Sequence, residues 1–351
     1  MGLRFRKSFT ISKGVKSDIG KIAQDFNFGN TGLRKTIISN RKLQFNDNEL
    51  ELHTEDTSFL HKEFSKEIIN GNIEEYKGDA KTAINEYKKV MDMITEIHRN
   101  SDESIDWNYV YKSPEPFNIN ALGPNALEVK EQIDNYIPTA SEKIFKTKLE
   151  KKLSNMKNDL RKAMEKDEET YNGWRTLVDL AGEVLRGNID AYFEVINEMR
   201  PLDDLLEFGV DFEFGSNSSD TIHVEYVADS SNTVPFFELS LSSNGKLQKN
   251  NFKRSQHNEI IRLYIAASAI RIAKDMFALL PIEKTVVHIV DDYINEVITK
   301  KERVTVLSVE FERDKLEKAE MKNKDPLEIL KGFNHNMKFT KAYGFSPVDR
   351  I

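Results

Sequence analysis

The spacing of apolar positions changes along the chain and divides it into three regions. Between Leu3 and Ile11, apolar and polar residues alternate, which predicts a β-strand, and similar short runs follow. Further along, apolar residues recur every three or four positions, which predicts helices. The last third contains both patterns. We therefore predict an α+β protein with a small antiparallel β domain at 1–54, a helical domain at 55–201 and an α+β domain at 202–351.

Two long helices are predicted in the central region. One carries apolar residues from Ile73 to Ile97, and the other runs from Ala140 to Lys166 behind a capping box of Thr139 and Glu142. A continuous helix of the second length would span about 40 Å. The simplest arrangement pairs the two in a long antiparallel helical arm, which could also join two copies of the chain.

The C-terminal region predicts strands and helices in the order β-β-β-α-β-β-α, an α+β sandwich. Its third strand is 235–241 and its last helix runs from Asp325 through Met337. This is also the core order of restriction-endonuclease-like nucleases, in which an acid near the second strand and a Glu on the third hold Mg²⁺. Asp220 and Glu238 stand at those places and would be the catalytic residues. However, Ser240 replaces the expected lysine, which favours an ordinary strand with Glu238 on its solvated face.

Other site chemistries find little support. The chain has no Cys, which excludes disulfides and thiol catalysis, and no two of its seven His stand at metal-ligand spacing. We expect no cofactor, with Mg²⁺ required only by the nuclease alternative.

Charge is distributed unevenly. The formal net charge is −7, yet ten basic residues face two acidic ones between Met1 and Lys42, and nine face three between Lys143 and Lys166. Two basic blocks in an acidic body can attract an anionic macromolecule, with DNA or RNA as the favoured candidate. They could instead dock on the acidic surface of the same chain or of a second copy. The residues predicted to bind the anion are Arg4, Arg6, Lys7, Arg34, Lys35, Lys148, Lys152 and Arg161.

The start of the chain carries a family resemblance. The run Met1–Ser8, with Gly14-Val15-Lys16 and the Gly-x-x-Gly stretch Gly29–Arg34, resembles the N-terminal domain known as domain of unknown function 4236. Lys21–Asn27 departs from the usual pattern of that family. The resemblance implies a bacterial or phage setting and a strand pair around the glycines. It implies no activity and no catalytic residue.

Together these observations favour a non-catalytic, multidomain bacterial or phage protein that contacts nucleic acid through its basic surfaces. A Mg²⁺-dependent nuclease and a structural subunit that self-assembles through the helical region are the alternatives. No apolar run reaches the ~18 residues of a membrane span and no signal peptide is evident, so we expect a cytoplasmic protein without a membrane partner.

Overall fold

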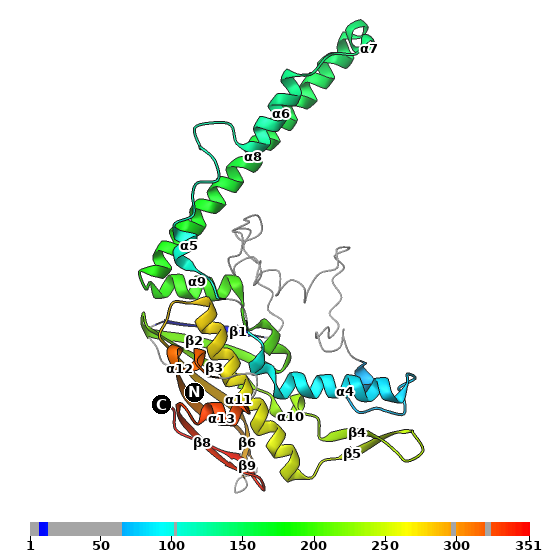
Figure 1. Ribbon diagram of the computed structural model, residues 1–351, viewed down its shortest axis with the longest axis vertical. Helices are drawn as coiled ribbons and strands as arrows, with labels where there is room; N and C mark the ends of the chain where they lie inside the picture. Colours follow the sequence, from blue (N-terminus) through cyan, green and yellow to red (C-terminus); the bar gives the residue numbers. More distant parts are fainter. Residues whose placement is uncertain (1–6, 13–64, 102–103, 296–299, 320–323) are drawn as a thin grey trace. The chain divides into compact units, whose positions relative to one another are not determined.

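The computed structural model describes residues 7–12, 65–101, 104–295, 300–319 and 324–351 (Figure 1). The described chain forms two compact units. Unit 2 is the continuous segment Asp106–Arg186, and unit 1 contains the described residues before and after it. Among the described residues, the units meet at 105/106 and at 186/187. The predicted boundary at 54 lies outside the described residues.

A mixed seven-stranded sheet forms the centre of unit 1. Neighbouring strands are antiparallel except β3 and β6, which are parallel. Parallel neighbours need a crossover connection, and helix α11 (Arg254–Leu279) lies within it. The order across the sheet is β1 (Lys7–Ser12), β2 (Gly209–Ser218), β3 (Thr221–Ala228), β6 (Lys284–Asn295), β7 (Lys300–Glu312), β8 (Asn334–Thr340) and β9 (Gly344–Ser346).

Helix α11 is the buried helix of unit 1. Most of its residues from Tyr264 onward are apolar, and every residue from Tyr264 to Ala273 is buried. The buried Arg271 forms an ion pair with Asp275 at 2.5 Å. It contacts β6 and β7 as well as α4 (Ala80–Thr95) and α13 (Pro326–Leu330). The hydroxyls of Tyr226 on β3 and Tyr264 on α11 lie 2.9 Å apart, which ties helix and sheet together by a buried hydrogen bond.

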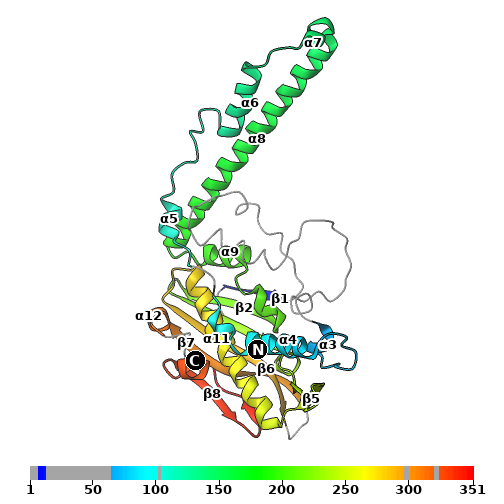
Figure 2. The same ribbon diagram turned by 45° about the vertical axis from the view of Figure 1, so that its right-hand side comes forward.

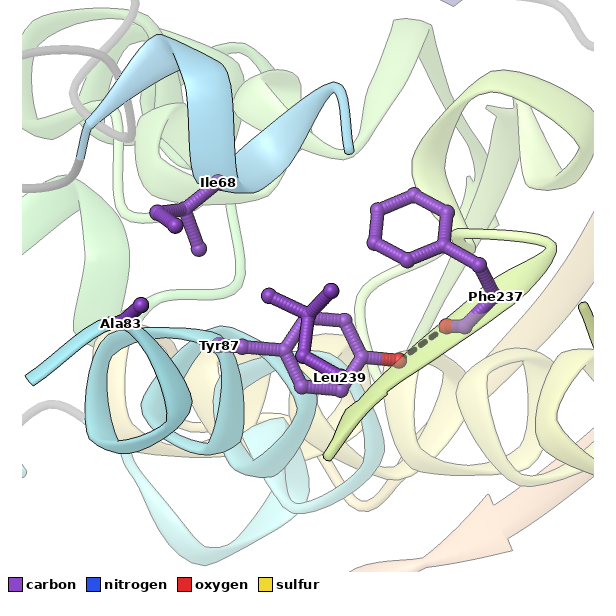
Figure 3. Close-up of a cluster of buried hydrophobic side chains, with 5 residues drawn as sticks. All are labelled: Ile68, Ala83, Tyr87, Phe237 and Leu239. Atoms are coloured by element: carbon purple, nitrogen blue, oxygen red, sulfur yellow. Dashed lines mark hydrogen bonds between the residues drawn. The ribbon is translucent and has the colours of Figure 1, made fainter. Parts of the chain in front are cut away.

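A second sheet, of two strands, packs against α4. It consists of β4 (Phe237–Leu241) and β5 (Leu247–Asn251). The Tyr87 hydroxyl of α4 donates a hydrogen bond to the Phe237 carbonyl, and their rings lie 5.6 Å apart between centroids. The alternating Phe237 and Leu239 give β4 the apolar face that covers the helix (Figure 3). The prediction that this helix pairs with the one at 140–166 is therefore wrong.

Two predictions in the C-terminal region also need correction, although the α+β class is confirmed. The predicted third strand is β4, which belongs to the small sheet and not to the large one. The last predicted helix ends at Leu330, and Asn334–Thr340 forms β8 against β7. Exposed and half-buried residues alternate along β8, which is the period of a strand.

Unit 2 is a helical arm built on one long helix. Helix α8 (Lys146–Leu185) has 40 residues and spans about 60 Å, so it continues well beyond Lys166, where the predicted helix ends. The predicted capping box is present, but it opens the short helix α7 (Ala140–Ile144). The helices α5 (Trp107–Tyr111) and α6 (Pro124–Asp134) pack along α8 in the antiparallel sense (Figure 2).

The remaining described helices are short and belong to unit 1. They are α3 (Lys66–Ile69), η2 (Ile97–Arg99), α9 (Ile189–Met199), η3 (Asp203–Glu207), α10 (Ser230–Thr233) and α12 (Arg313–Glu317).

Candidate nucleic-acid interface

The predicted anion-binding residues fall into two groups, one near the N-terminus and one on α8. Arg4, Arg6, Arg34 and Lys35 lie outside the described residues. Lys7 begins β1, and its backbone pairs with Ser216 of β2. The other three, Lys148, Lys152 and Arg161, are exposed on α8.

Two of these three share one flank of α8 with further lysines. Each residue of an α-helix advances by about 100° around the helix axis. Lys152 therefore lies about one turn after Lys148, and Lys166, five full turns after Lys148, lies on the same side of the helix. Lys162 lies about 40° away from that line. We call Lys148, Lys152, Lys162 and Lys166 the lysine row; all four are exposed, and the row extends over about 27 Å. Asp159 lies on the same flank, so the row carries a net charge of about +3.

Arg161 does not join this row. It follows Lys152 by nine residues, which amounts to about half a turn, so the two point to opposite flanks of the helix. Its guanidinium also forms an ion pair with Glu165 at 2.7 Å. The structure therefore keeps Lys148 and Lys152 together and separates Arg161 from them.

Aromatic rings lie against the first half of the row, and the Glu142 carboxylate is near enough to Lys152 to feel its charge. The Nζ of Lys148 is 5.2 Å from the centre of the Phe145 ring, and that of Lys152 is 6.0 Å from the Tyr136 ring. Glu142 has its pKa lowered, chiefly by hydrogen bonds from Thr139 and to a smaller degree by Lys152. Among the described side chains from 143 to 166, the one ion pair is that of Arg161.

A row of lysines can follow a nucleic-acid backbone without reading its bases. Each ammonium is a compact point charge on a flexible stem, which suits single phosphate contacts. Lys162 and Lys166 were not singled out from the sequence. Their spacing from Lys148, 14 and 18 residues along one continuous helix, is the signal that would have found them.

Unit 1 holds a second polar site on the sheet face that α11 does not cover. Successive side chains of a strand point to opposite faces of the sheet. Phe212 and Phe214 of β2 therefore lie in the core, and Asp211 and Glu213 lie on the open face. Glu213 is directly opposite Glu225 of β3. These three acids, with Arg303 and Arg350, line a cleft of about 500 Å³.

The segment after Phe345 lies across this face. The Arg350 guanidinium donates hydrogen bonds to Glu225 Oε2 at 2.5 Å and to Thr305 Oγ1 at 3.0 Å. The amide of Val348 donates to the Thr305 carbonyl at 3.0 Å, and that of Ile351 donates to Ser308 Oγ at 3.0 Å. Burial raises the pKa of Glu225, while Arg350 opposes that rise. A contact between residues 125 apart leaves no trace in local patterns, so it could not be read from the sequence.

Truncating Arg350 is expected to weaken unit 1. Arg350→Ala leaves the Glu225 carboxylate, whose side chain is 10% exposed, without this cation, and should cost about 1–3 kcal/mol of unfolding free energy at pH 7. Glu225→Gln combined with Arg350→Ala should recover part of the loss, because no buried charge then remains. Urea unfolding of the parent and the two variants tests this, and equal stability of Arg350→Ala and the parent would contradict it.

The structure does not bring the two predicted nuclease residues together. Asp220 lies in the turn before β3, where hydrogen bonds from Ser218 and Thr221 lower its pKa. Glu238 is exposed on β4 of the other sheet. The eight residues of β3, about 26 Å of extended chain, separate the turn from the segment that leads to β4. Within the described ranges, no group of three or more His, Asp or Glu side chains is arranged to hold a metal ion.

Comparison with known proteins adds no relative. The chain matches no family model, and no curated protein or solved structure matches it. The resemblance of the first forty residues stays a prediction. Within the part of the chain that the structure describes, no helix is both long and apolar enough to cross a membrane.

Proposed function

We propose that this protein is a non-catalytic binding protein whose helical arm lays the lysine row along the phosphate backbone of nucleic acid. The observation that supports this most directly is the row itself, four exposed lysines on one flank of a continuous helix. A bacterial or phage origin and a cytoplasmic location belong to the same proposal.

The dimensions of the row suit a nucleic-acid duplex. Double-stranded DNA carries one negative charge per ~1.7 Å of axis, so 27 Å of helix runs past many phosphates, of which four lysines can contact a few. Contacts of this kind position the protein and carry no base preference. We therefore expect binding that is independent of sequence and weakens steeply with salt.

Neutralising the row is expected to weaken binding more than neutralising the same charge elsewhere on the arm. The test variant carries Lys148→Gln, Lys152→Gln and Lys166→Gln. Its matched control carries Lys146→Gln, Lys157→Gln and Arg161→Gln, three exposed cations that lie off the row on the same helix. Fluorescence anisotropy with a labelled 30-base-pair duplex, a single-stranded DNA and an RNA, over a salt series, measures the affinity.

The row variant should bind the duplex at least tenfold more weakly at low salt, and the slope of log affinity against log salt should fall by about 2–3. The control should change affinity by less than threefold. Equal losses in the two variants, or an intact protein that binds none of the three nucleic acids at low salt, would overturn the proposal.

A further inference from the structure

The tip of the helical arm exposes apolar side chains. Between α6 and α8, Ile137 is 79% exposed, Ile144 is 74% exposed and Phe145 is 55% exposed. We call these three residues the apolar tip; they lie within nine positions at the turn where the arm reverses direction (Figure 2). Clustered apolar exposure of this kind is a sign of an interaction surface.

The backbone of the tip is held in a defined conformation. The Thr139 amide donates to Glu142 Oε2 at 2.8 Å and the Thr139 hydroxyl donates to the same oxygen at 2.6 Å, which caps α7. These bonds fix the start of the helix on which Ile144 lies. They also engage Glu142, which is the one acidic residue from Ile137 to Leu149.

The tip is cationic as well as apolar. Lys143, Lys146 and Lys148 lie beside Ile144 and Phe145 in the sequence, and all three are exposed. Apolar side chains next to lysines are the composition of surfaces that enter the headgroup region of anionic membranes, where the chains lose contact with water and the ammonium groups meet acidic lipids.

We propose that the apolar tip docks on an anionic lipid surface. A phosphate backbone would pair with the lysines but would leave Ile137 and Ile144 in water. A second copy docking tip to tip would bring its lysines against those of the first, and like charges disfavour that contact. An anionic bilayer accommodates both kinds of side chain. The sequence led us to expect no membrane partner because the chain has no membrane span, but lying on a surface requires none.

Vesicle flotation of the full-length chain tests this proposal. Vesicles of phosphatidylcholine alone are compared with vesicles containing 30% phosphatidylglycerol. The protein should float with the anionic vesicles and stay in solution with the neutral ones. The double variant Ile144→Asp, Phe145→Ser should lower the apparent partition coefficient at least tenfold. The matched control Tyr343→Ser, which removes a residue of unit 1 that is 69% exposed, should bind as the parent does.

A second readout reports insertion directly. The variant Phe145→Trp should show a blue shift of tryptophan emission with anionic vesicles and be quenched by brominated lipids, whereas the parent, with Trp107 and Trp174 far from the tip in sequence, should change little. Absence of vesicle binding, equal binding to neutral vesicles, or undiminished binding of the Ile144→Asp, Phe145→Ser variant would overturn the proposal. So would a change of molecular mass in solution on that substitution, because it would show that a second copy covers the tip.

This proposal and the nucleic-acid proposal can fail separately. The variant Ile137→Ser, Ile144→Ser keeps the whole lysine row, its aromatic neighbours and the charge of the tip. Its affinity for duplex DNA should stay within threefold of the parent, whereas its partition onto anionic vesicles should fall. Circular dichroism of each variant, with the same helical signal as the parent, shows that the arm remains folded.

Discussion

The variant Asp167→Asn is expected to lower the free energy of unfolding of unit 2 by about 2–4 kcal/mol. Asp167 lies in the middle of α8 and is 4% exposed. Its carboxylate accepts hydrogen bonds from the Asn125 amide at 3.1 Å, the Asn125 side chain at 2.7 Å and the Ala126 amide at 2.8 Å. It therefore satisfies free amides at the start of α6, where the helix dipole also favours a negative charge.

Asparagine removes that charge and can place an oxygen on only one side. Its NH₂ group would face either the Asn125 amide group or the Ala126 amide, and two donors cannot bond to each other. The space allows little rearrangement, because Gly123 is packed so tightly that an added Cβ would lie 2.4 Å from the Asp167 carboxyl carbon. We expect α6 to detach from α8, since this contact holds the N-terminal end of α6.

Tryptophan fluorescence isolates the effect. Both tryptophans of the chain, Trp107 and Trp174, lie in unit 2, so their emission during urea unfolding follows that unit alone. Asp159→Asn changes the same residue type at an exposed position of the same helix and should shift the unfolding free energy by less than about 0.5 kcal/mol. If Asp167→Asn proved as stable as Asp159→Asn, the capping role of Asp167 would be wrong.

The Asp167 contact also shows which part of the arm could not be predicted from the sequence. The apolar stripe of α8 from Leu149 to Met164 was recognisable, because a period of 3.6 marks the face that must be covered. Nothing in that period says what covers it. The sequence predicts the helix with apolar residues from Ile73 to Ile97 as the partner, whereas the structure uses α6, whose stripe is shorter and is interrupted by charged residues.

The same limit applies to the two sites. The lysine row could be extended from the sequence once α8 was known to be continuous, since azimuth follows from residue number. The contact of Arg350 with Glu225 could not, because it depends on how distant strands are ordered in the sheet. The alternation of side chains along a strand gives no sign of the segment that lies over Glu225.

His288 is expected to make unit 1 lose stability as the pH falls below about 6.5. The ring is 2% exposed on β6, and its Nδ1 lies 2.9 Å from the Ser308 hydroxyl of β7. Burial, together with the charges of Arg350 and His223, lowers the pKa of His288 to about 3. Glu225 of β3 is the neighbour of His288 in the parallel register, and Arg350 holds that carboxylate.

The direction of the effect follows from proton binding. Because the pKa of His288 is lower in the folded chain than in the unfolded chain, protons bind the unfolded chain preferentially between about pH 6.5 and pH 3. The stabilisation is complete above pH 6.5 and is lost at about 1.4 kcal/mol per pH unit below it. His98, whose pKa burial lowers to about 4, adds an effect of the same sign.

The variant His288→Gln separates this contribution from other titrations. It retains a polar group near Ser308 and should be less stable than the parent at pH 7.5, because the ring is lost from a packed site. That deficit should shrink by about 3 kcal/mol between pH 6.5 and pH 4.5, since only the parent must keep an imidazole unprotonated. Native-state hydrogen exchange of amides in β6 and β7 at pH 7.5, 6.5, 5.5 and 4.5 measures it, with His335→Gln, at a half-buried position of β8, as the control. If the difference in unfolding free energy between His288→Gln and the parent stays constant across this range, His288 carries a proton in the folded chain. A buried cation at that position would then need an anionic partner, and Glu225 is its neighbour in the strand register.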